Sequence, residues 1–424
     1  MSLIKIGDNN KLQMHDQLRD LGRIINDEEH HRSRLWDFDE ALKVLKRNKG
    51  TKKIEAINLS EGSSKSFDET AKRHGNNYTS KQFKKLTSLR LLYMKGAHLS
   101  GDFEDSMEEL KWLQWQNCPA SFERNNFHVN ELLVLELRRS EINEKWRGWS
   151  FFKMAEKLKY LDLTGCFSLE EDTDFLSAFK KLEVLILNYC YRLKRISTSI
   201  GDMEALLRLE LGWCRSLTEL PAEIGNLKAL KQLNLGDTRL LSALPDSIWF
   251  LENLEILDIS LIAIQELPNG IGRLRKLREL RASYCKLERI MAESMCDLSS
   301  LRCLDFISCY TLESLPDLPS GLTVLGITCQ SHKLPLLSHL AHLKELRVCF
   351  CTSLECIQVL PSTPLKNSEC SQSMDVEGLD SSQSLNIPFK LEILDVNHWI
   401  YQNSRRFTFY PSKDIIHQKL YEST

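Results

Sequence analysis

The chain lacks the features that mark several large classes of protein. Its 424 residues contain no run of 18 apolar residues, so the sequence predicts no membrane-spanning helix. The formal net charge is only −2, which predicts no general attraction to nucleic acid or to an anionic membrane. Residues 1–7 do not include the hydrophobic region of a secretory signal. We therefore expect a cytoplasmic or nucleocytoplasmic protein.

Two motifs of ligand chemistry are also absent. No G-x-x-x-x-G-K-[ST] phosphate loop occurs, and no C-x-x-C pair begins a zinc site. Cys349, Cys351 and Cys356 are close in sequence, but no histidines stand at a suitable spacing. We therefore expect no metal ion. No stretch outside the repeats described below is long enough for a catalytic domain, so we expect no enzyme and no catalytic residues.

The chain does contain a phrase, L-x-x-L-x-L-x-x-C, that recurs every 24 residues. Its opening leucines are Leu158, Leu182, Leu206, Leu230 and Leu254. Further copies open at 277, 301, 322 and 343, longer irregular units open at 54, 89, 110 and 132, and a last copy opens at 391. A fixed period in the twenties with this spelling is typical of a leucine-rich repeat solenoid, here with 14 candidate strands.

The phrase also predicts the layers of the fold. In each L-x-L the leucines point inward and the middle residue faces solvent. One coil cannot bury its own apolar face, so stacked coils make the core. The second halves that read L-P-x-x-I-G, as at 220–225 and 267–272, predict short helical turns. The expected fold is α/β, a curved horseshoe with a parallel β-sheet on its concave face and short helices or turns on its convex face.

The cysteines fit this repeat better than they fit disulfides. Seven of the 13 occupy its turn position, namely Cys118, Cys166, Cys190, Cys214, Cys285, Cys309 and Cys351. A buried free cysteine acts as a small hydrophobic residue. We therefore expect a column of structural thiols in a reducing compartment.

The first fifty residues do not follow the repeat pattern. Residues 2–6 and 11–14 read as two strands joined by a turn, and a helix is expected from His15 onward. Met14-His15-Asp16, with the following 17–23, resembles the M-H-D motif that ends the nucleotide-binding (NB-ARC) region of plant disease-resistance receptors. The extended form M-H-D-x-L-R-D-x-G-R is similar to the class with an N-terminal TIR domain, the flax rust resistance type. Residues 31–36 and 50–57 resemble that family's R-S-R-L-W junction and the entry to its first repeat, and the resemblance covers about residues 1–355.

The resemblance implies the C-terminal part of such a receptor. It divides the chain into a winged-helix and NB-ARC remnant at 1–50, irregular repeats at 51–157 and regular repeats at 158–359. A flexible polar insertion at 360–388 and a last repeat with a cap or tail at 389–424 follow. In the family the histidine of the motif lies against the phosphates of ADP, so the resemblance implies Met14, His15 and Asp16 as nucleotide-binding positions, with His15 at the phosphates. ADP or ATP is the cofactor of full-length receptors, but we expect none in this chain because the phosphate loop is missing.

The repeat phrase also predicts which residues bind a partner. The middle position of L-x-L carries Asp162, Glu210, Asp258, Arg281, Asp305 and Arg347, with Tyr160 and Arg208 on the same concave face. These acids are either part of the usual repeat sequence or a row of exposed acids, an acidic lane, that favours a basic partner. Two positions after the second leucine stand Tyr189, Trp213, Tyr284 and Phe350. Such aromatic residues either bind a partner, as at interface hot spots, or pack on the sheet edge. If Trp213 binds a partner, Trp213→Ala weakens binding and leaves the thermal midpoint nearly unchanged.

The resemblance implies recognition and autoinhibition in an intracellular plant immune receptor. Its partners are a pathogen effector or a guarded host protein, and the NB-ARC domain in full-length receptors, with no nucleic acid or membrane. The alternative is an interaction scaffold similar to the Ras-associated repeat proteins. The segment from Met14 to Arg23 separates the two, since a scaffold has no reason to carry it.

Overall fold

The structure is a computed structural model of the chain. It describes residues 33–60, 76–104, 106–120, 127–171, 175–267, 270–290, 295–328, 330–331 and 337–351, and the backbone of 4–6, 12–14 and 390–394. Among these residues no helix is long and apolar enough to cross a membrane. No group of three or more His, Cys, Asp or Glu side chains in the same ranges could hold a metal ion.

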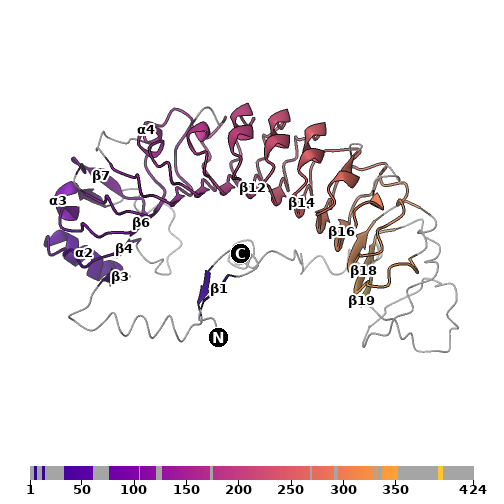
Figure 1. Cartoon of the computed structure of the whole chain (residues 1–424), viewed down its shortest axis with the longest axis horizontal. Coiled ribbons are helices and arrows are strands. Elements are labelled where there is room, and N and C mark those ends of the chain that lie inside the picture. Colours follow the sequence, from indigo (N-terminus) through magenta and orange to yellow (C-terminus); the bar gives the residue numbers. More distant parts are fainter. Residues whose placement is uncertain are drawn as a thin grey trace, which may run out of the picture.

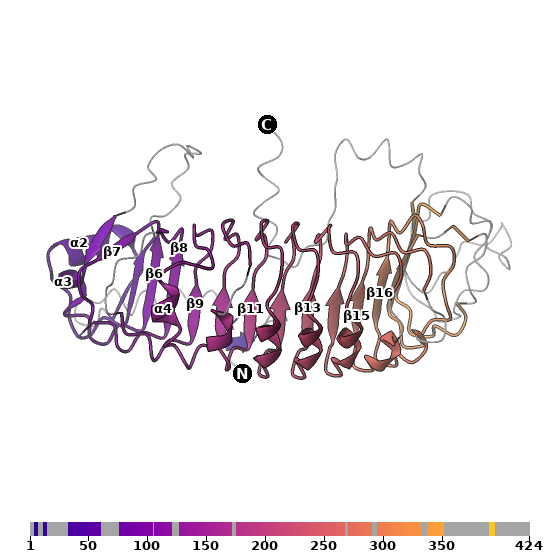
Figure 2. The same ribbon diagram turned by 90° about the horizontal axis from the view of Figure 1, so that it is seen from above.

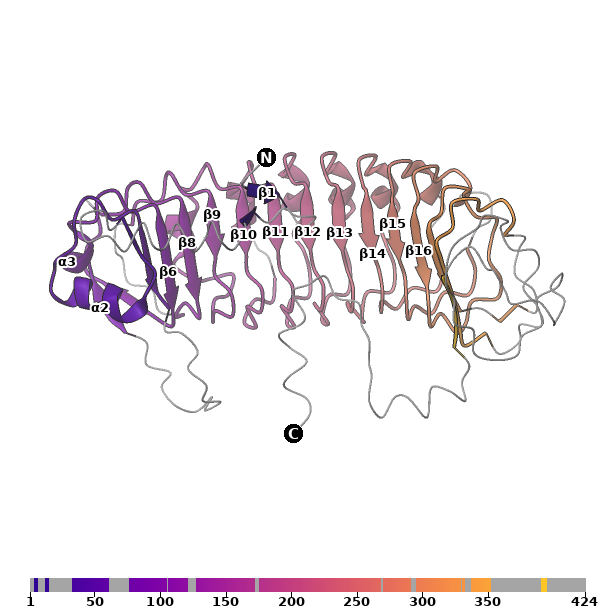
Figure 3. The ribbon, with the colours of Figure 1, turned by 90° about the horizontal axis from the view of Figure 1, so that it is seen from below.

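One long parallel sheet runs through the molecule and bends it into an arch (Figure 1). Within the described ranges it has 15 strands, ordered as in the chain. They are β3 (Arg34–Leu35), β4 (Ala56–Leu59), β6 (Leu91–Lys95), β8 (Trp112–Gln116), β9 (Val134–Glu136), β10 (Tyr160–Asp162), β11 (Val184–Ile186), β12 (Arg208–Glu210), β13 (Gln232–Asn234), β14 (Ile256–Asp258), β15 (Glu279–Arg281), β16 (Cys303–Phe306), β17 (Val324–Ile327), β18 (Glu345–Cys349) and β19 (Lys390–Leu394). All 14 strands expected from the repeat phrase are present. The predicted solenoid is therefore confirmed, and Figure 3 shows its strands side by side on the concave face.

The fifteenth strand, β3, was not expected. It pairs with β4 in parallel, so the sheet begins at Arg34, although the repeats were predicted to start at residue 51. Helix α2 (Phe38–Lys46) follows it, begun by Asp37, whose side chain accepts a hydrogen bond from the Glu40 amide at 2.9 Å. Ala41 and Leu45, one helical turn apart, are buried beside the first strands. Strand β3 and helix α2 thus cover the N-terminal end of the core.

The N-terminal repeats carry additional small elements. Strands β5 (Asn77–Thr79) and β7 (His98–Ser100) form a separate parallel pair. Helices α3 (Ser80–Phe83) and α4 (Trp149–Phe152) lie on the outside of the arch (Figure 1). Thr79 begins α3 in a capping box with Gln82, whose side chain accepts the Thr79 amide at 2.7 Å. The first of these units, residues 54–88, is 35 residues long, and β5 and α3 occupy its additional length.

The convex side of the regular repeats is made of short 3-10 turns (Figures 1 and 2). They are η1 (Leu176–Ala178), η2 (Thr198–Asp202), η3 (Ala222–Asn226), η4 (Asp246–Phe250) and η5 (Ile271–Arg273). Pro221 and Pro245 stand just before η3 and η4, where a missing N–H costs nothing. The helical turns predicted from L-P-x-x-I-G are confirmed.

The core is a stack of inward leucines closed at one edge by thiols. Leu161, Leu185 and Leu209 pair in register and are fully buried. The Cys190 Sγ lies 3.3 Å from the Leu163 carbonyl oxygen of the preceding repeat. All seven turn-position cysteines are buried and free of disulfides, as predicted. Burial raises the pKa of the Cys190 thiol to about 12, which keeps the sulfur protonated and unreactive.

At the N-terminus, β1 (Ile4–Ile6) and β2 (Leu12–Met14) form an antiparallel pair. The predicted hairpin is therefore present. The helix predicted from His15, the insertion at 360–388 and the tail after 394 lie outside the described residues.

Candidate protein-binding surface

The concave face gathers the predicted residues into two columns. Tyr160 pairs across the sheet with Val184 and then Arg208, while Asp162 pairs with Ile186 and then Glu210. The second column continues through Asn234, Asp258, Arg281, Asp305, Gly326 and Arg347. Eight of the predicted binding residues therefore share one face, as their spacing required.

Two of the predicted acids are nevertheless buried, which corrects the expectation that they face solvent. Asp162 is only 1% exposed. One of its carboxylate oxygens accepts the Thr164 amide at 2.9 Å, and the other lies 2.7 Å from the Arg138 guanidinium. The carboxylate therefore satisfies the backbone where the strand ends, a role that short polar side chains commonly take.

Glu210 is buried within a network of donors. Arg208 Nε and Asn234 Nδ2 each lie 2.7 Å from its carboxylate, and Gln232 Nε2 lies 3.0 Å away. Its side chain is 4% exposed, whereas that of Arg208 is 27% exposed. Because the charge is already paired and surrounded by amides, Glu210 has no free acceptor surface for a partner.

The proposed acidic lane is therefore not an acidic surface. Further along the column, Arg347 binds Glu345 at 2.8 Å and lies 4.0 Å from Asp305. Asp305 also accepts the Ile307 amide at 3.0 Å. Each described carboxylate of this kind accepts a backbone amide two residues further along the chain or binds an arginine. The geometry therefore favours the interpretation that these acids are part of the usual repeat sequence.

Asp258 illustrates the cost of this arrangement. Its carboxylate accepts the Ser260 amide at 2.9 Å, as Asn234 accepts the Gly236 amide one repeat earlier at the same distance. Burial raises the pKa of Asp258, although the hydrogen bonds to Ser260 and the charge of Arg281 oppose the shift. A neutral amide makes the same backbone contact without that desolvation penalty.

The edge of the sheet beyond the strand ends has an unusual backbone. Most regular repeats have one residue with a positive φ, including Tyr189 at 62°, Trp213 at 65° and Tyr284 at 59°. The N–H of each donates to a carbonyl of the next repeat, at 2.8 Å for Tyr189 and 2.7 Å for Trp213. Gly165 holds the same position in its own repeat, with φ of 72°. The left-handed conformation is thus required by the stacking, and glycine adopts it most easily.

Aromatic side chains gather at this edge over three successive repeats. Phe167 stacks on Tyr191 with ring centroids 5.6 Å apart, and Tyr189 stacks on Trp213 at 5.4 Å. Tyr189 and Tyr191 meet edge to face at 6.2 Å. The Arg215 guanidinium lies 4.6 Å from the Trp213 ring centroid and 5.8 Å from that of Tyr191. We call these five residues the aromatic edge.

The arginine of the aromatic edge is held in place by a buried acid. Two nitrogens of Arg215 lie 2.8 and 2.7 Å from one oxygen of Asp237. Arg239 Nε lies 2.5 Å from the other oxygen. Asp237 is 1% exposed, whereas the side chains of Arg215 and Arg239 are 40% and 57% exposed. One buried negative charge therefore supports two cations at the surface.

The remaining predicted aromatic residues lie further along the solenoid. Asp237 and Leu261 occupy the column between Trp213 and Tyr284, which is 45% exposed. Phe350 is 6.0 Å from Tyr310, ring centroid to centroid. Phe167, Tyr191 and Arg215 were not among the predicted residues. Each stands two residues after a left-handed position, directly after a turn cysteine, and that 24-residue spacing is the signal that could have found them.

The predicted nucleotide-binding positions are not tested by the structure. Met14 ends β2, described by its backbone alone, and His15 and Asp16 lie outside the described residues.

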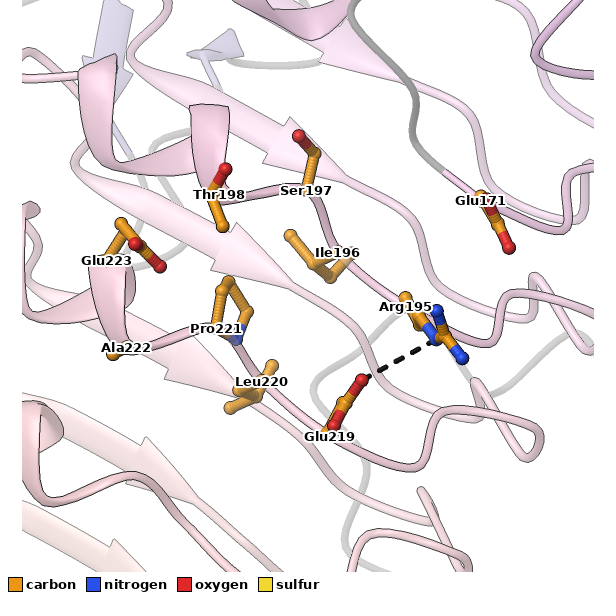
Figure 4. Close-up of a pocket in the computed structure, with 10 residues that line it drawn as sticks. All are labelled: Glu171, Arg195, Ile196, Ser197, Thr198, Glu219, Leu220, Pro221, Ala222 and Glu223. Atoms are coloured by element: carbon orange, nitrogen blue, oxygen red, sulfur yellow. Dashed lines mark ion pairs between the residues drawn. The ribbon is translucent and has the colours of Figure 1, made fainter.

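A hollow on the convex side between η2 and η3 is drawn in Figure 4. Arg195 and Glu219 face one another across it at 3.5 Å, and both side chains are 67% exposed. Ser197, at its rim, accepts the Ser199 amide at 3.2 Å and so begins η2. These polar groups serve the turn and a solvent-screened ion pair, and they converge on no common point.

Comparison with known proteins agrees with this architecture. The family model described as "Leucine-rich repeat region" matches residues 163–407, more than half of the chain. A solved structure of the repeat ectodomain of the plant receptor kinase GASSHO1/SCHENGEN3 from Arabidopsis thaliana is 19% identical, with a TM-score of 0.44. It covers 76% of this chain and 42% of that one.

Plant disease-resistance proteins are similar to part of the chain. Disease resistance protein RPP2A of Arabidopsis thaliana is 32% identical over 167 residues, covering 38% of this chain and 12% of that protein. Disease resistance protein RUN1 of Vitis rotundifolia is 30% identical over 203 residues, covering 40% and 14%. The matched segment is thus a small part of each relative. Both relatives are disease-resistance proteins, the class of protein that residues 14–23 resemble.

Proposed function

Because this chain belongs to the leucine-rich repeat family, we propose that it is the recognition region of an intracellular plant immune receptor. Its similarity to disease-resistance proteins supports a role in defence. The partner in this proposal is a protein, either a pathogen effector or a guarded host protein. The repeat fold presents a long curved surface and is typically a non-catalytic interaction fold.

The aromatic edge is the observation that carries the proposal. Trp213, Tyr191 and Phe167 are rigid rings at a surface, with an arginine packed between two of them. Trp, Tyr and Arg are the residues that most often dominate the energy of protein interfaces. The concave columns beside them are rich in hydrogen-bonding groups, and these groups are already paired with one another or with backbone amides. Such a surface suits the polar rim that surrounds an anchor in a protein interface.

The proposal includes contact with a nucleotide-binding domain that precedes the repeats. Residues 14–23 resemble the end of that domain in the resistance family, and the sheet follows from β3. In such a receptor the repeats would stabilise the inactive state, and a bound partner would shift the equilibrium between the two states.

The test is proximity labelling in plant cells that express the chain fused to a biotin ligase. We compare the wild type with Trp213→Ala and with Leu261→Ala, which changes the same column position outside the aromatic edge. The expected result is a set of proteins that the wild type and Leu261→Ala label and that Trp213→Ala labels at least about tenfold less. Identical labelling by all three would contradict the proposal.

A further inference from the structure

We propose that the aromatic edge binds an acidic segment of the partner protein, one whose carboxylates alternate with apolar side chains. This inference rests on the proposed function and specifies the chemistry of the ligand at the same site. It reverses the hypothesis of an acidic surface for a basic partner, because the concave acids are internally paired.

The backbone shows that these side chains are not needed to build the edge. Tyr189 and Trp213 occupy left-handed positions, which glycine adopts more easily than a residue with a side chain. Gly165 fills the corresponding position one repeat before Tyr189 and makes the same backbone contact, to the Asn188 carbonyl at 2.8 Å.

The rings provide the apolar half of the site. Phe167 is 48% exposed and Tyr191 is 38% exposed, although they stack on one another. Their stack continues through Tyr189 to Trp213, so a row of ring faces and edges spans three repeats. Apolar side chains that alternate along an extended segment could lie against such a row, since they recur on one side every two residues.

Arginines provide the charged half. Arg215 and Arg239 share Asp237 between them, so this group retains one net positive charge, and both guanidinium groups reach the surface. Arg139 flanks the other end, because a Cβ on Gly165 would lie 3.3 Å from the Arg139 Cγ and 3.6 Å from the Phe167 ring. Arginine binds carboxylates through paired hydrogen bonds, which suits an acidic segment.

The acidic residues around the aromatic edge leave its net charge positive. Glu170 is held by both Arg192 and Lys194, so this group also keeps one net positive charge. Glu141 takes the place of Phe167 in the preceding repeat and is exposed, which marks where the aromatic edge ends. Asp237 is buried beneath its two arginines. A carboxylate that approaches the rings therefore meets cations first.

The experiment uses the full chain and synthetic peptides of 12 residues. One set alternates Asp or Glu with Leu or Phe, and the matched set replaces every acid with its amide. Fluorescence anisotropy with labelled peptides measures binding. We expect the acidic set to bind at least about tenfold more tightly than the amide set, with the difference shrinking as salt is added.

Three variants locate the binding. Trp213→Gly keeps a backbone that glycine adopts readily, and Leu261→Gly makes the same change at φ of 60° outside the aromatic edge. Trp213→Gly should weaken peptide binding at least about tenfold, and Leu261→Gly should leave it unchanged. Arg239→Gln should weaken the acidic set about threefold or more and leave the amide set unaffected. Circular dichroism of each variant confirms that it is folded.

Equal affinity for the acidic and amide sets, or no binding by either, would overturn this inference. Tight binding of the acidic set by Trp213→Gly would also overturn it. These failures differ from failure of the proposed function. If Trp213→Ala loses labelled partners in cells but the peptides do not bind, recognition stands and the acidic ligand does not.

Discussion

The N-terminal repeats and the regular repeats differ in what they do with part of their aromatic rings. Between residues 76 and 157, Tyr78, Phe83, Phe103, Trp115 and Phe152 are almost fully buried. The regular repeats bury Phe175, Phe179 and Trp249 in the same way, but Phe167, Tyr189, Tyr191 and Trp213 stack on one another at the edge of the sheet. Both regions thus use rings for packing, and the regular repeats also place a stacked group of rings at the edge.

The difference follows from how each region fills its coils. The regular repeats are closed by leucines and by small thiols, such as Cys214, whose sulfur lies 3.1 Å from the Leu187 carbonyl oxygen. The first N-terminal unit, from residue 54 to 88, is longer, and its Phe83 lies 5.9 Å from Phe103 of the next unit, ring centroid to centroid. In the regular repeats the thiol fills the turn, and the residue after it, such as Phe167 or Tyr191, is exposed.

The largest expected effect comes from the buried rings. Trp115→Ala removes a side chain that is fully buried and whose Nε1 donates to the Ala97 carbonyl at 3.0 Å. Loss of the indole leaves a cavity, and we expect the free energy of unfolding to fall by about 3 to 5 kcal/mol in a urea titration. Gln114→Ala, on the concave side of the same strand, is the control and should change it by less than about 0.5 kcal/mol. Equal effects would show that the N-terminal core does not depend on its rings.

A second prediction tests the close spacing of the regular repeats. A Cβ on Gly225 in η3 would lie 2.5 Å from the Ser247 carbonyl oxygen in η4, a backbone atom that cannot rotate away. Gly225→Ala should therefore lower the free energy of unfolding by about 1 to 3 kcal/mol, measured by denaturant titration. Ala222→Ser, exposed on the same turn, is the matched control. An unchanged Gly225→Ala variant would mean that the turns can separate freely.

Much of this fold could be predicted because the repeat phrase states it directly. The 14 strands, the buried thiols and the convex turns all follow from residues at a fixed spacing. Strand β3 and helix α2 could not be found in that way, because the sequence around Arg34 and Leu35 does not match the repeat pattern. Its place in the sheet depends on Ala56 and Ile57, the β4 residues with which it pairs.

The candidate site was harder to predict than the fold. Alternation correctly assigned Asp162 and Glu210 to the concave face, but it carries no information about crowding there. Their burial depends on donors 24 residues away in the chain, Arg138 for Asp162 and Asn234 for Glu210. At the edge, the repeat pattern was followed only as far as Trp213, although the position after each turn cysteine also recurs every 24 residues and includes Arg215. The contact between the two side chains depends on the left-handed turn, which appears only in the backbone.

A third prediction compares two substitutions at one position. Trp213→Gly should be more stable than Trp213→Ala by about 1 to 2 kcal/mol, because alanine retains the steric cost of a positive φ. At Trp115, within strand β8, the order should be the usual one, with alanine more stable than glycine. Thermal unfolding of the four variants measures both differences. The same order at both positions would show that the edge of the regular repeats is not strained.

The smallest expected effect concerns charge in the concave columns of the two regions. In the N-terminal β4, Asn58 accepts the Ser60 amide at 2.9 Å, and in the regular β14 Asp258 makes the equivalent contact with a carboxylate. Burial raises the pKa of Asp258 above its unfolded value. The folded state therefore holds this proton more tightly, and the resulting stability is present at low pH and lost as the pH rises through the folded pKa.

Asp258→Asn should accordingly increase the free energy of unfolding at pH 7 by less than about 1 kcal/mol. Its advantage over the wild type should shrink as the pH is lowered toward 4, because the wild-type carboxylate then becomes neutral as well. Urea titrations of both proteins across this range measure the difference. Asn234→Asp supplies the opposite change, since it would place a carboxylate where an amide now donates to Glu210 at 2.7 Å, and it should destabilise the protein at pH 7. If Asp258→Asn is instead less stable at pH 7, attraction to Arg281 outweighs desolvation, and β14 gains from a charge that β4 does without.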